Sequence, residues 1–289
     1  MELKKIKLIS TAEMVKMDGN LILQALPIHE MERGDPILLI HHWKTEIPAE
    51  SRVRELGVGP HPHRGFSPVT LVFQGSMEHR DSRGNRGVVG PGGAQWMHAG
   101  MGIMHSERPP RELAESGGML ELVQFWVNVP QRYKMIQPSY QNISQETVPV
   151  IKSPQGGIEI KLVAGHLLGS NGPAKILSPV TAMQVYALAK DRFEFEVEEG
   201  QQLFFYALDG LYKLNGKVIG PTQVALLTPE ATGIALEVLE EGRAILIGGK
   251  SIEEPVVQYG PYVVTNQTEV LQAMRDYQLG KMGILIEDF

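Results

Sequence analysis

Short apolar or alternating segments, separated by Gly, Pro, Asn and Asp, fill roughly the first 136 residues of the chain. An alternation of apolar and polar positions over about four to eight residues, bounded by turn residues, is typical of β-strands. The clearest examples are residues 21–26, 37–42, 69–73 and 120–127. Helix-period patterns are scarce in this region. The first half is therefore predicted to be a β-sandwich or barrel.

The strand pattern stops near Pro130 and resumes after Pro149. We interpret the polar stretch between these prolines as an interdomain linker. Seven further strands are predicted beyond it, at residues 158–163, 183–188, 193–197, 203–208, 224–227, 234–238 and 244–247. The chain of 289 residues is therefore expected to hold two domains, residues 1–136 and residues 137–289.

The two halves repeat one order of elements. In each half a strand, a Gly turn, a second strand and a Gly-Pro turn follow one another, with the turns at Gly75 and Pro91 in the first half and at Gly210 and Pro221 in the second. Such an internal repeat predicts duplicated β-barrels.

One helix is predicted, near the end of the chain, over residues 267–279. Asn266 or Thr268 can cap its N-terminus, and Gly280 ends it. Its apolar stripe predicts packing against a sheet or barrel, with these members: Val270, Leu271, Met274 and Tyr277. We assign this helix no chemistry.

Two pairs of potential metal ligands lie within the Gly-rich stretch from residue 61 to residue 107. His61 and His63 form one pair, and His105 and Glu107 form the other. Residues two apart in a strand point to the same face, so each pair can chelate an ion. Two such strands, neighbouring or facing across a small barrel, would bring three imidazoles and one carboxylate to a common point. These ligands suit iron, nickel, copper, manganese or zinc, and an octahedral ion would keep about two positions open.

The second half lacks a comparable set. Counted from the repeated turns, the matching positions are Glu196, Glu198, Ala235 and Glu237, and His166 is the only histidine after residue 105. We therefore expect one metal site, in the first barrel. His79 and His98 are expected to support the ligands or to lie at the surface rather than to bind the metal.

Composition excludes several classes of protein. Acidic residues number 33 against 27 basic ones, for a net charge of −6, and no stretch concentrates Lys and Arg, which disfavours direct binding of nucleic acid. The chain has no cysteine, so disulfides, thiolate catalysis and cysteine-based metal sites are excluded. No run approaches the roughly 18 apolar residues of a membrane span, and the N-terminus lacks the apolar core of a signal peptide. A cytoplasmic protein is expected, with no membrane partner.

Three segments resemble the pirin family of the cupin superfamily: His61-Pro-His-Arg-Gly-Phe66, residues 71–81 and residues 95–107. Asp35-Pro36, residues 125–128 and residues 260–264 extend the resemblance over nearly the whole chain. It implies an all-β bicupin, two jelly-roll-like cupin β-barrels in tandem, with a single metal in the N-terminal barrel.

The resemblance implies four ligands in this chain, namely His61, His63, His105 and Glu107. Cupins in general carry a glutamate four or five residues after the second histidine of the first motif, but this chain has Ser67 and Pro68 there. The carboxylate must then come from Glu107, as in pirins.

Pirins resemble quercetin 2,3-dioxygenases, so the resemblance implies an oxidoreductase that opens a flavonol ring with O2 at one mononuclear metal. We predict Fe(II) as the ion, with Zn, Ni, Mn or Cu as alternatives. Glu107 is the acid–base candidate, able to take the proton of the flavonol hydroxyl. Two alternatives stay open. The substrate could be another enolic or phenolic molecule, or the protein could be a metal-dependent redox sensor or transcriptional coregulator that acts by binding a protein partner.

Overall fold

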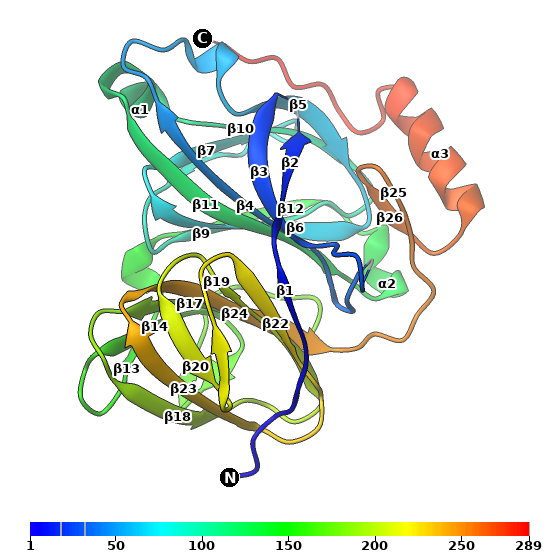
Figure 1. Cartoon of the computed structure of the whole chain (residues 1–289). Coiled ribbons are helices and arrows are strands. Elements are labelled where there is room, and N and C mark those ends of the chain that lie inside the picture. Colours follow the sequence, from blue (N-terminus) through cyan, green and yellow to red (C-terminus); the bar gives the residue numbers. More distant parts are fainter. Residues whose placement is uncertain (18, 32, 289) are drawn as a thin grey trace. The chain divides into compact units, whose positions relative to one another are not determined.

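The computed structural model describes residues 1–17, 19–31 and 33–288, and these form two compact units built mainly from β-strands. Unit 1 consists of Met1–Met17, Leu21–His42 and Glu146–Ser251, and unit 2 is centred on Trp43–Gln145 and the residues after Ser251. In Figure 1 the strands of each unit curl into a barrel. The prediction of an all-β fold with two cupin-type barrels and a C-terminal helix is confirmed.

The barrel of unit 1 is built from the N-terminal strand and most of the second half of the chain. Its strands are β1 (Ile6–Thr11), β13 (Val150–Lys152), β14 (Ile158–Ala164), β17 (Val180–Ala187), β18 (Arg192–Glu196), β19 (Gln201–Ala207), β20 (Leu211–Leu214), β21 (Lys217–Ile219), β22 (Gln223–Leu227), β23 (Gly233–Glu240) and β24 (Gly242–Lys250). They form two sheets, with the orders β1-β22-β19-β24-β17-β14-β13 and β18-β23-β20-β21. A two-stranded ribbon of β15 (His166–Leu167) and β16 (Ser170–Asn171) is added to them.

The barrel of unit 2 is built mainly from the first half of the chain. Its strands are β5 (Val58–His63), β6 (Phe66–Gln74), β7 (Met77–Asp81), β8 (Arg86–Val89), β9 (Ala94–His98), β10 (Ile103–Arg108), β11 (Gly118–Asn128) and β12 (Ser139–Ile143). One sheet has the order β5-β10-β7-β8. The other begins β12-β9-β6-β11, and its strand order continues through β4 (Ile37–Ile47), β3 (Asn20–Leu26) and β2 (Glu13–Met17), of which the residues from 13 to 17 and from 21 to 42 are counted with unit 1. The short helices are α1 (Arg111–Ser116), α2 (Gln131–Lys134), η1 (Val53–Glu55) and η2 (Gln145–Thr147).

The strand orders of the two barrels are the same once the strands are paired in sequence, except that the edge strand β12, which follows β11, has the N-terminal strand β1 as its counterpart. The order β5-β10-β7-β8 matches β18-β23-β20-β21, and β12-β9-β6-β11-β4-β3-β2 matches β1-β22-β19-β24-β17-β14-β13. Identical topology in two halves of one chain is what a duplicated domain produces, so the structure agrees with the predicted internal repeat.

The compact units do not coincide with residues 1–136 and 137–289, because the two ends of the chain are exchanged. Strand β1 pairs with β22 in unit 1, whereas the residues after Ser251 belong to unit 2. The stretch interpreted as a linker also contains β12, which pairs with β9 as an edge strand of unit 2. Polar composition indicated a linker there because an edge strand exposes one side to water.

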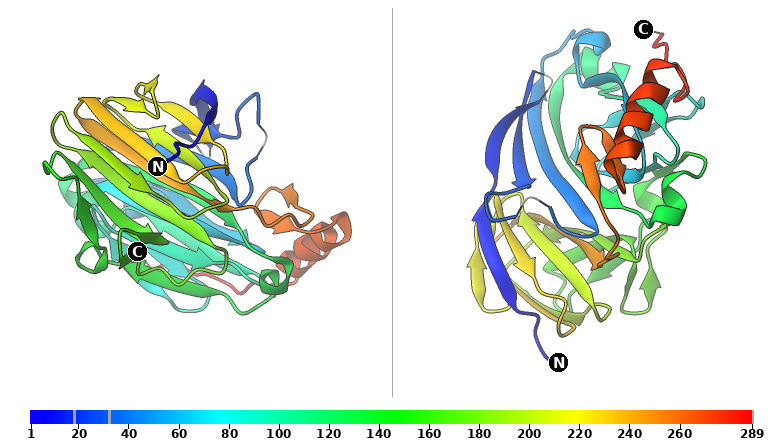
Figure 2. Two further views of the ribbon diagram at one scale, coloured as in Figure 1. Left: turned by 90° about the horizontal axis from the view of Figure 1, so that it is seen from below. Right: turned by 90° about the vertical axis from the view of Figure 1, so that its right-hand side faces the viewer.

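The C-terminal segment adds a hairpin and the predicted helix to unit 2. Strands β25 (Val257–Tyr259) and β26 (Tyr262–Val264) pair, and α3 (Gln267–Gln278) lies beside them in both views of Figure 2. The Asn266 side chain caps α3 by accepting a hydrogen bond from the Glu269 N–H, as predicted. The predicted apolar stripe is wrong in part: Val270 and Ala273 are buried, but Leu271 is 67% exposed. The packed face therefore lies about one residue away from the predicted one.

Apolar side chains fill the interior of unit 1. The buried cluster includes Phe193, Phe195, Phe205, Tyr212 and Leu236, each 5% exposed or less. Among the described residues, no group of close metal-ligating side chains lies in this unit. The interior of unit 2 has a different composition.

Candidate metal centre

Six polar side chains line the inner face of the sheet formed by β5, β10 and β7. In the antiparallel register, His105 faces His61 on one side and Asp81 on the other, and Glu107 faces His79. His63 lies two residues after His61 on the same face. The side chains between them point to the opposite face of the sheet, because the side-chain period of a strand is two.

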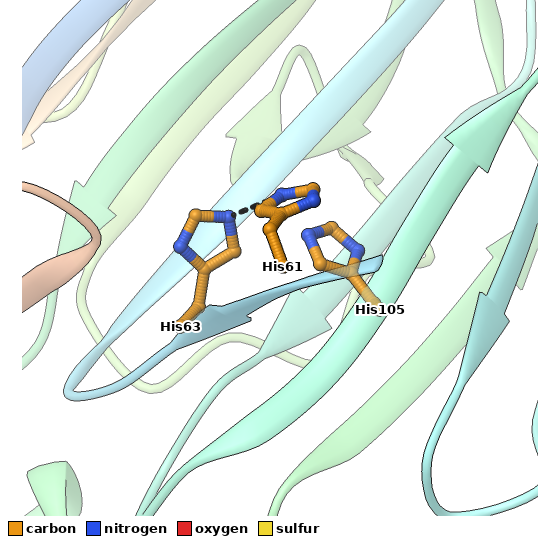
Figure 3. A group of neighbouring side chains, drawn as sticks. All are labelled: His61, His63 and His105. Carbon is orange, nitrogen blue, oxygen red and sulfur yellow. Dashed lines mark hydrogen bonds between the residues drawn. The ribbon is translucent and has the colours of Figure 1, made fainter. Parts of the chain in front are cut away.

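Three histidines form a compact cluster in this position. One ring nitrogen from each of His61, His63 and His105 lies within 4.8 Å of the others. Figure 3 shows the three rings turned toward a common space, with His61 and His63 carried by β5 and His105 by β10. Nε2 of His61 and Nε2 of His63 are 3.1 Å apart. His63 and His105 are 3% and 1% exposed, whereas His61 is half-buried.

The other nitrogens of the β5 pair contact backbone carbonyls. His61 Nδ1 is 2.8 Å from the oxygen of Gly59, and His63 Nδ1 is 3.4 Å from the oxygen of Pro261. A carbonyl oxygen only accepts, so each Nδ1 carries the proton and each Nε2 of the neutral ring presents a lone pair. His105 Nε2 is also buried, and it has no hydrogen-bond partner among the described residues.

Three converging lone pairs are the arrangement that a cation satisfies. Nitrogen ligands about 2.1 Å from an ion and at right angles to each other lie about 3 Å apart, close to the separation of the β5 pair. Hydrogen bonds from the far side of each ring, which orient the imidazole and fix its tautomer, are the usual surroundings of histidine ligands. The residues present therefore fit a divalent transition metal.

The electrostatic environment of His63 and His105 favours their neutral form. Burial, followed by the nearby His61, lowers the pKa of His63 well below its ordinary value, and the contact with Pro261 opposes this shift. Burial, followed by His61, His63 and His79, lowers the pKa of His105 in the same direction. Neutral imidazole is the form that binds a metal.

Glu107 lies outside the histidine cluster, because its carboxylate oxygens are not among the ligand atoms that lie within 4.8 Å of one another. Its carboxylate accepts hydrogen bonds from Thr70 and Gln124 of the opposite sheet. The Gln124 amide lies 2.9 Å from Oε1 and 2.8 Å from Oε2, and Thr70 Oγ1 lies 3.1 Å from Oε1. Its role as fourth ligand remains a prediction.

Aromatic rings form one wall beside the histidines. The Trp126 ring lies 5.4 Å from His63 and 4.3 Å from Phe66, measured between centroids. Gln124 and Trp126 are two residues apart on β11 and are linked by a hydrogen bond from the Trp126 indole. Both side chains are half-buried, as is His61, so this edge of the cluster is the one that solvent reaches.

The hairpin β25–β26 supports His63 from behind. The carbonyl of Pro261 accepts from both His63 Nδ1 and the Arg64 N–H, and the Val263 N–H donates to the carbonyl of Arg64. Gly65 has a φ of +84°, and a Cβ at this position would overlap the carbonyl oxygen of Val263. The backbone of β26 therefore packs directly against the backbone that follows β5, with no space for a side chain at residue 65.

The remaining histidines of the first barrel, His79 and His98, lie outside the cluster. His79 Nδ1 is 3.4 Å from His105 Nδ1, its Nε2 is 3.2 Å from the carboxylate of Asp81, and its ring is stacked on Tyr140. His98 is buried and contacts Ser67 and the carbonyl of Tyr133. Neither belongs to the described cluster of ligand atoms.

Two family models match the chain, and together they cover most of it. The pirin model matches residues 19–127, and the model of the pirin C-terminal cupin domain matches residues 182–283. The chain belongs to the pirin family. A Pseudomonas aeruginosa protein provisionally named quercetin 2,3-dioxygenase is 36% identical over 245 residues, which is 85% of each chain.

Solved structures of pirins agree with this assignment. A crystal structure of quercetin 2,3-dioxygenase from Acinetobacter baumannii aligns with a TM-score of 0.91 at 29% identity, over 99% of this chain and 100% of that one. A bacterial pirin from Escherichia coli, described as a complex with nickel(II), aligns with a TM-score of 0.62 over 84% of this chain and 100% of that one. At 18% identity, the second similarity shows the shared fold.

In this pirin the second barrel replaces the site with apolar side chains. By strand register, His61 and His63 correspond to Phe193 and Phe195, and His105 and Glu107 correspond to Leu236 and Val238. The predicted matches, by contrast, lie on the other face of their strands and are not buried: Glu196, Glu198, Ala235 and Glu237. That alignment was wrong because counting from the turns missed the register by three positions at Glu196 and by one position at Ala235, and an odd error reverses the face of a residue in a strand.

Several residues of the site were missed by reasoning from the sequence. Asp81 lies two residues after His79 on a strand, the same signal that identified the ligand pairs, and could have been recognised. Thr70 and Gln124 face each other on β6 and β11, but nothing in the sequence indicates this pairing. Among the described residues no helix is long and apolar enough to cross a membrane.

Proposed function

We propose that this pirin is a metal-dependent dioxygenase that acts on quercetin or a related flavonol or enolic molecule at the centre formed by His61, His63 and His105. The observation that carries the proposal is the convergence of three imidazole nitrogens, two of them 3.1 Å apart. Glu107 would complete the ligand set. A divalent metal bound there would act as a Lewis acid and would bring the hydroxylated substrate and O2 together.

The side chains of the opposite sheet suit a flat aromatic substrate. Trp126 offers a ring beside His63 at the edge that solvent reaches, and the fully buried Phe66 packs against Trp126 and His63 from within. An aromatic substrate can stack there while its hydroxyl points toward the histidines. The buried rings around His63 also exclude water from the reacting atoms, which strengthens charge interactions at the site.

Glu107 is the acid–base residue of the proposal. Its carboxylate is buried, 8% exposed, and is oriented by donors from Thr70 and Gln124. An ionised carboxylate beside the ligands can accept the proton of a substrate hydroxyl, and Gln124 then holds the resulting acid in place.

The test is oxygen uptake with quercetin by protein loaded with Fe(II) under anaerobic conditions. We expect uptake that matches the loss of flavonol absorbance and disappears in His63→Ala. A protein that holds one iron per chain yet consumes no oxygen with any flavonol or enolic substrate would contradict the proposal. Matched loading with Ni, Mn, Cu and Zn ranks the metals. Stoichiometric zinc after anaerobic purification from iron-supplemented cells would contradict Fe(II) as the native ion.

A second candidate function is metal-dependent protein binding, and one observation favours it. The outer face of β10, the strand of His105 and Glu107, is covered by the end of the chain. The carbonyl of Met282 accepts from the Met104 N–H, and Arg108 binds both oxygens of Glu287. A change at the metal could alter this surface and so the affinity for a partner.

The second candidate predicts that hydrogen exchange of residues 281–288 changes between the Fe(II) and Fe(III) forms. Identical exchange in the two forms would remove it. We also propose a cytoplasmic location, which cell fractionation tests.

A further inference from the structure

Asp81, His79 and His105 form a chain of contacts that leads to the metal centre. Asp81 Oδ2 is 3.2 Å from His79 Nε2, and His79 Nδ1 is 3.4 Å from His105 Nδ1. All three side chains are 3% exposed or less. His105 Nε2, on the side of the ring away from His79, faces His61 and His63 and has no hydrogen-bond partner among the described residues.

The direction of each contact is decided at the Asp81 end. Asp81 Oδ1 accepts the N–H groups of Arg83 and Asn85, and Oδ2 accepts the side-chain amide of Asn85. A carboxylate held by three donors is an acceptor, so the proton in its contact with His79 lies on Nε2 of that ring. In the neutral form of His79, Nδ1 then carries no proton and is the acceptor for His105.

His105 must donate from Nδ1 to make this contact, which leaves its Nε2 as a lone pair. This contact of 3.4 Å is the longer of the two between the three side chains. The His79 ring is held in place for it by stacking on Tyr140, with the ring centroids 4.0 Å apart and the ring planes 5° apart. Backbone carbonyls fix the tautomers of His61 and His63 on β5, whereas the side chains of His79 and Asp81 take the place of a carbonyl behind His105.

We propose that Asp81 and His79 are positioning residues that fix His105 in the Nδ1–H tautomer, so that its Nε2 is ready to bind the metal. Asp81 fixes which ring nitrogen of His79 carries the proton, and His79 in turn fixes which ring nitrogen of His105 carries the proton. The inference rests on the metal site of the proposed function but does not require that a flavonol be the substrate.

The alternative is that Asp81 only stabilises the turn that follows β7. Asp81→Asn separates the two roles. The N–H groups of Arg83 and Asn85 keep the amide oxygen at the position of Oδ1, which directs the new NH2 group toward His79 Nε2. The proton of His79 is then forced to Nδ1, and that of His105 to Nε2, where it faces the metal position.

The first measurement is the 15N spectrum of the imidazoles in histidine-labelled, metal-free protein. We expect His79 as the Nε2–H tautomer and His105 as the Nδ1–H tautomer, and we expect both to reverse in Asp81→Asn. An Nε2–H tautomer for His105 in the unaltered protein, or no reversal in the variant, would overturn the inference. Because no metal or substrate is present, failure of the proposed function leaves this result unaffected.

The second measurement is the affinity for Fe(II) and Zn(II) in a double-mutant cycle. Loss of a partner behind a ligand histidine typically lowers metal affinity roughly 10- to 100-fold. We expect such a loss in Asp81→Asn and in His79→Phe, which keeps a ring against Tyr140, and no further loss when the two are combined. Losses that multiply in the double variant, as for independent sites, would contradict a single relay.

Asp191→Asn is the matched control. Asp191 is also buried and stabilises a turn, accepting from Ser153, the Gly157 N–H and the Arg192 N–H, but it lies in unit 1, away from any histidine cluster of the described residues. We expect it to lower thermal stability with metal affinity unchanged. Metal affinities of Asp81→Asn and His79→Phe within twofold of the original protein would reject the relay while leaving the proposed function intact.

Discussion

Arg64 and Asp276 form an ion pair that joins the residue after a predicted metal ligand to the C-terminal helix. Arg64 Nη2 lies 3.0 Å from Asp276 Oδ2, and both side chains are 10% exposed or less. Arg64 also donates from Nε to the carbonyl of Met101. Burial raises the pKa of Asp276, but hydrogen bonds from Lys281, Arg64 and Gln272 outweigh it and hold the pKa below its usual value. The pair therefore fixes the backbone beside His63 through contacts with a segment about 200 residues away.

Removal of one partner of this pair should be costly. Arg64→Met leaves Asp276 buried with Lys281 and Gln272 alone, and loss of one member of a buried pair typically costs about 3–5 kcal/mol. We expect about 3 kcal/mol in chemical denaturation, because two partners remain, together with faster proteolysis after residue 265. Arg192→Met, which breaks the exposed pair with Glu194, is the control and should cost less than about 1 kcal/mol. Equal effects in the two variants would contradict the role assigned to Arg64.

Gln124 should affect turnover without affecting the metal. Gln124→Leu removes the donor that holds both oxygens of Glu107 but keeps a similar side-chain volume. We expect kcat with quercetin to fall by roughly 100-fold, the lower range for loss of an oriented acid–base group, with one metal still bound per chain. Metal content and oxygen uptake are measured on the same sample. Unchanged kcat would exclude a catalytic role for the oriented Glu107.

Metal should stabilise unit 2 through the histidine cluster. An ion at about 100 times its Kd adds about 2.7 kcal/mol to the free energy of unfolding when it binds only the folded state. We expect Fe(II) or Zn(II) to raise the melting temperature, and a chelator to reverse the change. His105→Ala should abolish the response, whereas His166→Ala, which alters an exposed histidine of unit 1, should preserve it. A full response in His105→Ala would place the metal elsewhere.

Acid should destabilise unit 1 partly through His41. Burial lowers the pKa of His41 from 6.5 to about 4. The unfolded chain therefore binds a proton between these values that the folded chain does not, so stability is complete above about pH 6.5 and falls as the pH decreases to about 4. The full effect is about 3 kcal/mol. Denaturation at pH 7 and pH 4.5 should show a smaller loss for His41→Gln than for the original protein, and equal losses would contradict it.

The parts of the site that depend on strand period were predicted from the sequence. His61 and His63, and His105 and Glu107, share a face because residues two apart in a strand always do, and the structure brings the three histidines together. The same period failed for the second barrel, where an error of three positions placed Glu196 in the role that belongs to Phe193. A period of two gives the face only when the register is known, and loop lengths differ between the two halves.

The contacts that orient the ligands were beyond prediction because they join distant segments. His63 Nδ1 contacts the backbone carbonyl of Pro261. Every residue type has such a carbonyl, so no pattern of side chains in the sequence predicts this contact. Glu107 is held by Gln124, a residue of the opposite sheet that reads in the sequence as an ordinary polar position of a strand. The helix α3 was predicted correctly from its cap, but its link to Arg64 depends on tertiary structure alone.

The support of His63 by Pro261 has a consequence for how the protein is made. A ribosome releases the chain from its N-terminus, and domains usually begin to fold in that order. All the ligand histidines emerge before residue 110, but the carbonyl that orients His63 and the helix that anchors Arg64 are synthesised more than 150 residues later. The nascent chain therefore carries its metal ligands without their final geometry until Pro261 and helix α3 have been synthesised, and the centre matures only after that point.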